Sequence, residues 1–306
     1  MMKCVQLIYF VSLFFLISCS KMNSNTVIEK LQNGHYSIKH DNIALEIDPD
    51  LGARVISAKI NEDELLLQER DSLLNWGSTF WLSPQSAWNW PPPQAIHLGN
   101  YQSRIEGDRL LLTSKVDAKF GISASKEFHY NEKKKCLEIQ YKIVNETDSV
   151  QHYGPWEITV VPAEGAKVFF PMGEEPEGTK GNIEFENNNG IAWFKYEHKR
   201  MEVWHKIFNN PAEGWLAHIN KERTLFIKSF ELISPKDIAP AQGNVEVYIS
   251  KKFKYIELEN HGKYTILPPG ESLSYKVNWY ISKLPDGISA DQYTEELVKL
   301  VRTFVR

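Results

Sequence analysis

The stretch "LEIQYKIVN", residues 137–145, decides the fold class of this chain. Its apolar residues Leu137, Ile139, Tyr141 and Ile143 alternate with polar ones, so they would lie on one face of an extended strand. A helix would instead need apolar residues three or four positions apart. The stretch therefore predicts a β-strand that turns one face toward a core.

Short runs with the same alternation recur through the chain, separated by Gly, Pro, Asn and Asp. This pattern is typical of antiparallel strands in a sandwich or barrel. The runs occupy residues 43–48, 53–60, 108–116, 223–231, 244–250 and 275–282.

The last segment, residues 289–306, has helical spacing instead. Ser289 and Gln292 stand in the spacing of a capping box, which marks a helix start. One apolar stripe follows, made of Tyr293, Leu297, Leu300, Val301 and Phe304. We expect an all-β fold of mostly antiparallel strands with a C-terminal helix.

Composition narrows the class of partner. The 306 residues carry a net charge of −4, and this lack of basic excess argues against nucleic acid. Aromatic residues make up 12% of the chain, with 9 Trp. Such enrichment suits carbohydrate, because an aromatic face can cover the apolar C–H face of a sugar ring.

The N-terminus resembles a bacterial lipoprotein signal. Lys3 precedes an apolar run from Val5 to Ile17, which is shorter than the roughly 20 residues of a membrane span. The tetrad "LISC" then resembles the lipobox, in which the Cys is lipidated. An ordinary signal peptide with an incidental Cys19 is the alternative.

The lipobox interpretation divides the chain into three parts. We expect a signal peptide at 1–18, lipidated Cys19 with a polar tether at 19–30, and a single β-sandwich domain at 31–306. The protein would then lie in the bacterial cell envelope, periplasmic or on the outer membrane, and would touch the membrane through its lipid anchor only. Cys136 would have no disulfide partner.

The stretch "FWLSPQSAWNWPPPQ", residues 80–94, holds Trp81, Trp88 and Trp90 followed by three prolines. Proline lacks the N–H that a sheet ladder needs, so this segment predicts a stiff loop rather than a core strand. Such a loop suits ligand binding, with the indoles stacking on sugar rings. Each Trp is about as suited to core packing, which is the alternative.

Several motifs are absent. The chain has no Gly-rich phosphate loop, no His-Glu-x-x-His helix, no CxxC pair and no GxSxG elbow. Its nine His residues show no metal-ligand spacing. We therefore expect no cofactor and no metal.

Two strand-like segments carry acidic residues. In "YIELEN", residues 255–260, Glu257 and Glu259 would share a face about 7 Å apart, and their mutual repulsion would raise one pKa. In "PWEIT", residues 155–159, Glu157 would alternate with the flanking apolar residues. A solvated acidic face is the alternative in each case.

Three segments resemble the galactose mutarotase (aldose 1-epimerase) superfamily. Residues 52–68 look like its opening strand, residues 141–159 are similar to its mid-chain active-site region, and residues 255–281 resemble its C-terminal Glu strand and final strand. A group of mutarotase-like proteins, often secreted lipoproteins, also shares the "W-x-S-P-Q-S-x-W-x-W-P" pattern. The resemblance implies a β-supersandwich.

The resemblance also implies a proton-transfer site. Mutarotases use a late Glu as base and a mid-chain His as acid to open and reclose the sugar ring. The alignment places the base at Glu259, with Glu257 as the shifted option. The family His is missing here, so Glu157, His152 and His205 are the candidate acids.

A noncatalytic role on the same fold is the second interpretation. Such a protein would be a glycan-binding lipoprotein of a polysaccharide-utilisation system. Its sugar contacts would come from Trp81, Trp88, Trp90, Glu157, Glu259 and Lys206.

An accessory or lyase role is a third possibility, because the supersandwich also occurs in polysaccharide lyases and glycosidases. A lyase would need a Tyr or His base beside a charge-neutralising residue. Tyr196 and Arg200 are the candidates for those roles.

Overall fold

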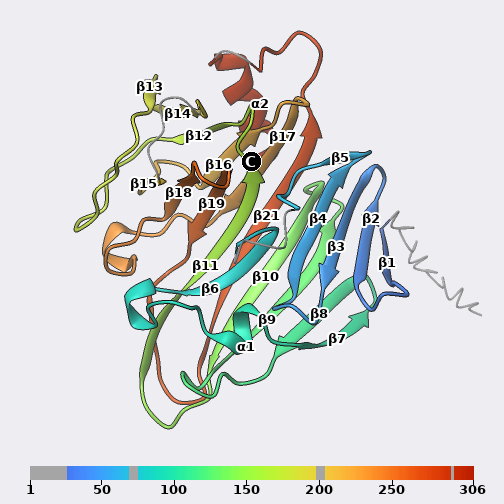
Figure 1. Ribbon diagram of the computed structural model, residues 1–306, viewed down its shortest axis with the longest axis vertical. Helices are drawn as coiled ribbons and strands as arrows, with labels where there is room; N and C mark the ends of the chain where they lie inside the picture. Colours follow the sequence, from blue (N-terminus) through green and yellow to red (C-terminus); the bar gives the residue numbers. More distant parts are fainter. Residues whose placement is uncertain (1–25, 69–74, 198–203, 291–292) are drawn as a thin grey trace, which may run out of the picture.

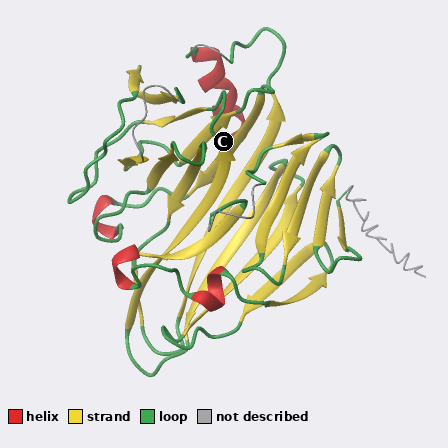
Figure 2. Cartoon of the chain, viewed as in Figure 1, coloured by secondary structure: helices red, strands yellow, loops and turns green. Residues whose placement is uncertain are grey.

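Two large β-sheets packed face to face make up the protein (Figure 1). The computed structural model describes residues 26–68, 75–197, 204–290 and 293–306. Strand pairs within these ranges are antiparallel, and helices are short apart from one at the C-terminus (Figure 2). The expected all-β sandwich of mostly antiparallel strands with a C-terminal helix is confirmed.

The first sheet holds the surface of interest. Two short strands lie beside its main path, β5 (Asp63–Glu64) next to β4 and β20 (Thr265–Leu267) next to β11. Across the sheet the order is β1 (Val27–Lys30), β2 (Tyr36–His40), β3 (Ile43–Asp48), β4 (Arg54–Ile60), β6 (Ser78–Ser83), β11 (Gln151–Pro162), β19 (Tyr255–His261), β18 (Val245–Ser250) and β15 (Trp204–Asn209).

The second sheet backs the first. Its order is β13 (Glu186–Asn188), β14 (Ile191–Lys195), β12 (Lys167–Pro171), β16 (Trp215–Ile219), β17 (Thr224–Phe230), β21 (Ser272–Lys283), β10 (Cys136–Asn145), β9 (Ile122–Asn131), β8 (Arg109–Ser114) and β7 (Tyr101–Glu106).

The alternating stretch 137–145 forms most of β10, at the centre of the second sheet. Ile139 lies opposite Val277 of β21 and opposite Phe128 of β9. These residues, together with Leu137, are buried in the hydrophobic core between the sheets. The period-two pattern therefore identified the core face of this strand correctly.

The C-terminal helix α2 (Glu295–Val305) begins later than the capping-box spacing predicted. Thr294, rather than Ser289, is the N-cap, and its hydroxyl accepts a hydrogen bond from Leu297 N at 3.2 Å. The predicted apolar stripe does pack inward, since Leu297 and Val301 are buried in a second cluster with Trp215 of β16. The helix thus covers the outer face of the second sheet.

Within the described ranges, three other helical turns lie in connecting segments. They are η1 (Gln85–Ala87), α1 (Gln94–His97) and η3 (Pro235–Asp237). Among the described residues, none of the helices has the length and apolar character needed to traverse a bilayer. The predicted signal peptide, Cys19 and the tether up to residue 25 fall outside the described residues. The end of the predicted tether is not a tether, because Val27–Lys30 form β1, which pairs with β2.

Candidate functional site

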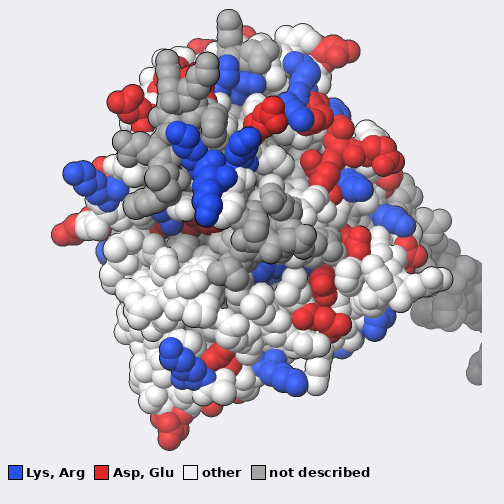
Figure 3. Space-filling model, in the orientation of Figure 1, with Lys and Arg blue, Asp and Glu red and all other residues white. Residues whose placement is uncertain are grey.

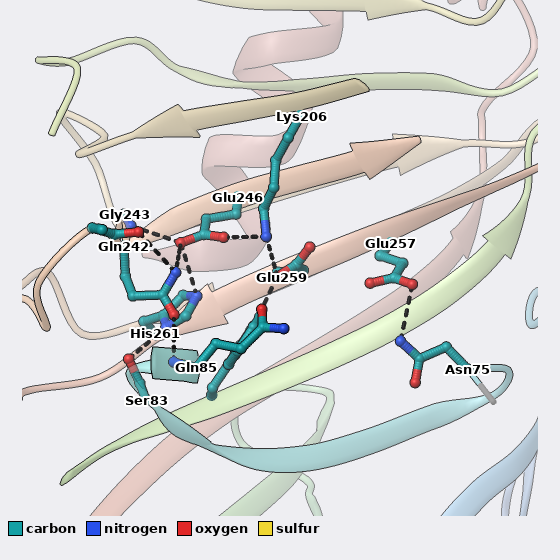
Figure 4. A network of polar contacts seen from close by, with 12 residues as sticks. Asn75, Ser83, Gln85, Lys206, Gln242, Gly243, Glu246, Glu257, Glu259 and His261 are labelled. Atoms are coloured by element: carbon teal, nitrogen blue, oxygen red, sulfur yellow. Dashed lines mark hydrogen bonds and ion pairs between the residues drawn. The ribbon is translucent and has the colours of Figure 1, made fainter. Parts of the chain in front are cut away.

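Strand β19 presents Glu257, Glu259 and His261 on one face of the first sheet (Figure 4). Alternation along the strand separates them from Leu258 and Asn260, which face the second sheet. Glu246 of β18 lies directly opposite Glu259 in the strand register. Three acids and one imidazole therefore gather on the outer face, where the second sheet does not cover them.

Lys206 of β15 supplies the positive charge of this cluster. Its Nζ lies 2.5 Å from Glu246 Oε2 and 3.3 Å from Glu259 Oε2. The two carboxylates are almost fully buried, whereas the Lys206 side chain is 16% exposed. Burial acts to lower the pKa of Lys206, but the two carboxylates outweigh it and raise that pKa, so the ammonium stays charged.

Glu246 is held as an anion by several donors. Gly243 N donates to its Oε1 at 2.8 Å, and Gln242 Nε2 donates to the same atom at 3.0 Å. His261 Nε2 lies 3.3 Å from that oxygen. Burial favours the protonated form, but Lys206 and His261 prevail and lower the pKa of Glu246 to about 2.

The pKa values of Glu257 and Glu259 are raised, in contrast to that of Glu246. Burial, followed by the charge of Glu259, raises the pKa of Glu257 to about 8, although Asn75 Nδ2 donates to Glu257 Oε1 at 3.0 Å. Burial also raises the pKa of Glu259, whose Oε2 accepts a hydrogen bond from Trp156 Nε1 at 2.9 Å. The predicted coupling of the two acids on one face is therefore present.

One trio of these side chains has the donor set of a metal site. Ligand atoms of Glu246, Glu259 and His261 lie within 4.8 Å of one another. The ammonium of Lys206, however, already contacts both carboxylates and brings the charge that a cation would bring. We therefore assign the cation position in this cluster to Lys206.

Four indoles extend the same face toward β6. Trp81 pairs with Trp156 across the β6–β11 register, and their ring centroids are 5.1 Å apart, edge to face. Trp88 packs 5.7 Å from Trp81. Trp90 lies 5.8 Å from Trp81 and is 48% exposed, whereas the other three are at most 3% exposed.

The three Trp residues predicted to stack on sugar differ in burial. Trp81 donates through Nε1 to His97 Nδ1 at 2.9 Å, and Trp88 donates through Nε1 to Leu82 O at 2.8 Å. These two indoles are packing residues whose N–H groups are satisfied internally. The expectation of a loop rather than a core strand is wrong for Trp81, which lies within the buried strand β6. Of the three indoles predicted to stack on sugar, Trp90 alone presents a large exposed face.

A groove of about 520 Å³, open to solvent, lies beside this cluster. One wall is the loop that follows β6, where Pro84 ends the sheet ladder, and the other is the turn before β18. Gln85 N donates to Gln242 Oε1 at 3.3 Å and so joins the two walls. The lining residues are Pro84, Gln85, Ser86, Asn89, Trp90, Lys206, Phe208, Pro240, Ala241 and Gln242.

Glu157 lies on the other face of the sheet and does not meet Glu259. Its Oε1 accepts hydrogen bonds from Tyr141 Oη and Trp279 Nε1, each at 3.0 Å, and its Oε2 lies 3.2 Å from Lys228 Nζ. All three partners belong to the second sheet. The expectation that Glu157 shares a cleft with Glu259 is corrected, because alternation along β11 turns Glu157 inward.

The two candidate histidines also lie away from the cluster. His152 is exposed and stacks on Tyr264 at 3.5 Å, six positions along β11 from the residue opposite Glu259, or about 20 Å. His205 is adjacent to Lys206, so it faces the opposite side of β15, and its Nδ1 lies 3.0 Å from Asn182 O. Neither histidine reaches Glu259.

Only one of the two lyase candidates lies among the described residues. Tyr196 is buried at 9% exposure. Arg200 lies outside the described residues.

Glu246, His261 and Gln242 were not identified from the sequence. A weak signal exists for Glu246, because it is a single acid between two valines in an alternating run. His261 continues the face of Glu257 and Glu259 by two further positions, so the same alternation would have predicted it. Gln242 gave no signal, because its role depends on a turn that meets another loop.

The family model described as "Domain of unknown function (DUF4380)" matches residues 34–282. No curated protein matches the chain.

Solved structures share the fold at low identity. A TPR-domain containing protein from Parabacteroides distasonis ATCC 8503 is 15% identical with a TM-score of 0.60, over 85% of this chain and 49% of that one. A galactose mutarotase-like protein from Lactobacillus casei ATCC 334 is 10% identical with a TM-score of 0.57, over 81% and 100%. A putative aldose 1-epimerase from Escherichia coli K12 is 14% identical with a TM-score of 0.52, over 82% and 99%.

These neighbours give the chain a mutarotase-like β-sandwich fold, as the sequence resemblance implied. The chain spans about half the length of the Parabacteroides protein. The family itself follows from the matched model, which covers well over half of the residues, and the chain belongs to the DUF4380 family.

Proposed function

We propose that this protein binds carbohydrate in the groove between the loop after β6 and the turn before β18. The observation that carries the proposal is Trp90, a 48% exposed indole on the wall of a solvent-open groove. Its ring is held in place by contact with buried Trp81 and Trp88. A sugar ring could stack on that face without first ordering a mobile side chain.

The polar lining supports the same ligand class. Gln85, Ser86 and Asn89 place amide and hydroxyl groups along the groove, and Lys206 adds an ammonium. Sugar hydroxyls both donate and accept hydrogen bonds, so they match amides, which do the same. The fold neighbours include proteins described as mutarotase-like, which is consistent with a sugar ligand.

We expect Trp90→Ala to weaken binding of the best ligand from a glycan array at least tenfold, because the stacking face is removed from the groove. Isothermal titration calorimetry would measure the change. Ile266→Ala is the matched control, since Ile266 is 64% exposed on β20 and does not line the groove. Equal affinity for wild type and Trp90→Ala would reject this groove as the sugar site.

Mutarotase-type catalysis is the second candidate, favoured by one observation. Glu259 and His261 lie two positions apart on the same face of β19, which restores a Glu–His pair to this face. Glu259 would take the anomeric proton and His261 would serve as the acid. Lys206 would have to leave Glu259 before the carboxylate could reach a sugar.

Polarimetry of freshly dissolved aldoses tests this candidate. If catalysis occurs, Glu259→Gln should slow mutarotation by about 10²-fold or more while glycan binding persists. If the wild-type protein accelerates mutarotation of none of the aldoses, the binding role stands without catalysis.

We further propose that Cys19 carries a lipid and holds the domain at the bacterial cell envelope. The support is the "LISC" tetrad after a short apolar run. Cells fed radiolabelled palmitate should label the wild-type protein and not Cys19→Ala. Label that persists in Cys19→Ala would exclude this anchor.

A further inference from the structure

The groove has two separate aromatic positions. Trp90 comes from the loop between η1 and α1, whereas Phe208 comes from β15 at the edge of the sheet. The described ring contacts connect Trp90 to Trp81 and Trp81 to Trp156, and Lys206 Nζ lies 5.3 Å from the rings of both Trp156 and Phe208. Trp90 and Phe208 thus line the groove from different elements, and none of the described ring contacts joins them directly.

We infer that the groove holds a neutral oligosaccharide of at least two sugar rings, with one ring against Trp90 and another toward Phe208. The inference rests on the proposed carbohydrate function and specifies its ligand. A volume of about 520 Å³ lies well inside the 300–1,000 Å³ of pockets that hold drug-sized ligands. A single sugar stacked on Trp90 would leave part of this volume without a ligand.

Because the groove is open to solvent, a bound oligosaccharide chain can extend along it, whereas an enclosed pocket would suit a monosaccharide. Its two walls come from different loops and are joined by the hydrogen bond from Gln85 N to Gln242 Oε1. Gln242 in turn donates to buried Glu246, so the walls are tied to the charged cluster beneath. A groove held in this way is preformed, which lowers the entropy lost when a long ligand binds.

Charge argues for a neutral ligand. Among the described residues that line the groove, Lys206 is the single charged one, and its ammonium is already shared between Glu246 and Glu259. An anionic sugar would have to compete with two buried carboxylates for that one cation. The face over β6 and η1 is also largely free of charged side chains (Figure 3).

A ladder of neutral glycans tests the inference. Cello-, xylo-, malto- and manno-oligosaccharides of one to six sugar residues would be titrated into the full-length protein, and calorimetry would measure their affinities. We expect affinity in the responding series to rise at least tenfold from one ring to three and then to level off. Phe208→Ala should remove most of that gain while it leaves monosaccharide affinity within twofold.

A control variant separates an effect on the packing of the protein from the loss of a direct contact with the sugar. Phe208 is partly exposed, and Phe208→Leu keeps its apolar bulk without the ring. If this variant melts like the wild type but also loses the rise in affinity from one sugar ring to three, the effect belongs to the aromatic face. A galacturonide ladder provides the charged comparison. We expect each of its members to bind at least tenfold more weakly than the neutral chain of equal length.

Each outcome has a distinct meaning. A monosaccharide that binds as tightly as the longest chain would overturn the two-ring inference and leave the proposed function intact. Tighter binding of galacturonides would overturn the neutral ligand. Failure of every glycan in all ladders would overturn the proposed function and the inference together.

Discussion

Lys228→Met should lower the free energy of unfolding by about 3–5 kcal/mol, because it leaves the carboxylate of Glu157 buried without its paired cation. Both side chains are fully buried, with Lys228 Nζ 3.2 Å from Glu157 Oε2. The same ammonium donates to Leu258 O at 2.8 Å. Urea unfolding followed by tryptophan fluorescence would measure the loss.

The double variant Glu157→Gln, Lys228→Met removes both charges and should recover more than half of that loss. Gln keeps an acceptor for the Tyr141 and Trp279 hydrogen bonds, so few polar atoms are left unsatisfied. Lys299→Met is the matched surface control, since its pair with Glu295 is exposed and should be worth less than 1 kcal/mol. A Lys228→Met protein within 1 kcal/mol of wild type would contradict the expected role of the pair.

The Glu157–Lys228 pair explains why an acid in the active-site segment is structural here. Glu157 joins β11 of the first sheet to β10, β17 and β21 of the second through Tyr141, Lys228 and Trp279. A buried charge that needs three specific partners penalises any register in which those partners are missing. The pair therefore orients β11 and turns Trp156 toward the outer face.

The strands were largely predictable from local pattern. The run 244–250 became β18 at Val245–Ser250, and 223–231 became β17 at Thr224–Phe230, because alternation within a strand needs no knowledge of distant residues. The C-terminal helix begins later than its sequence spacing predicts. Ser289 and Gln292 have capping-box spacing, but the structure uses Thr294 as the N-cap, directly before the buried stripe.

The candidate site was only partly predictable. Alternation placed Glu257 and Glu259 on one face, but it could not say which face of β11 would lie outward. Every residue of that strand from Tyr153 to Val161 is buried, so polarity does not distinguish its two sides. Glu246 and Lys206 join Glu259 only because β18 and β15 follow β19 in the sheet order, which is a long-range property.

Lys206→Met should cause a loss of about 3–5 kcal/mol at pH 7, since two buried carboxylates lose their shared cation. The variant also tests the charge balance of the outer cluster. The groups that face Glu246 are Lys206 from β15 and Glu259 and His261 from β19. Without Lys206, burial raises the pKa of Glu246, and His261 is left as the cation that can lower it.

The contribution of Glu246 to stability should then respond to acid in opposite directions in the two proteins. In the wild type the pKa of Glu246 is lowered to about 2, so its contribution is present above pH 4.5 and is lost as pH falls toward 2. In Lys206→Met that pKa should rise above its ordinary value, so stability would be lost as pH rises and regained as pH falls.

Urea unfolding at pH 7, 5.5 and 4 would show the difference as a stability gap between the two proteins that narrows toward pH 4. Adding Glu246→Gln to Lys206→Met removes the titrating acid that lies closest to the lost ammonium, so the double variant should show a flatter pH dependence than the single one. A gap of constant size at all three pH values would mean that Lys206 does not set the charge of Glu246. The cation position in this cluster would then need another occupant.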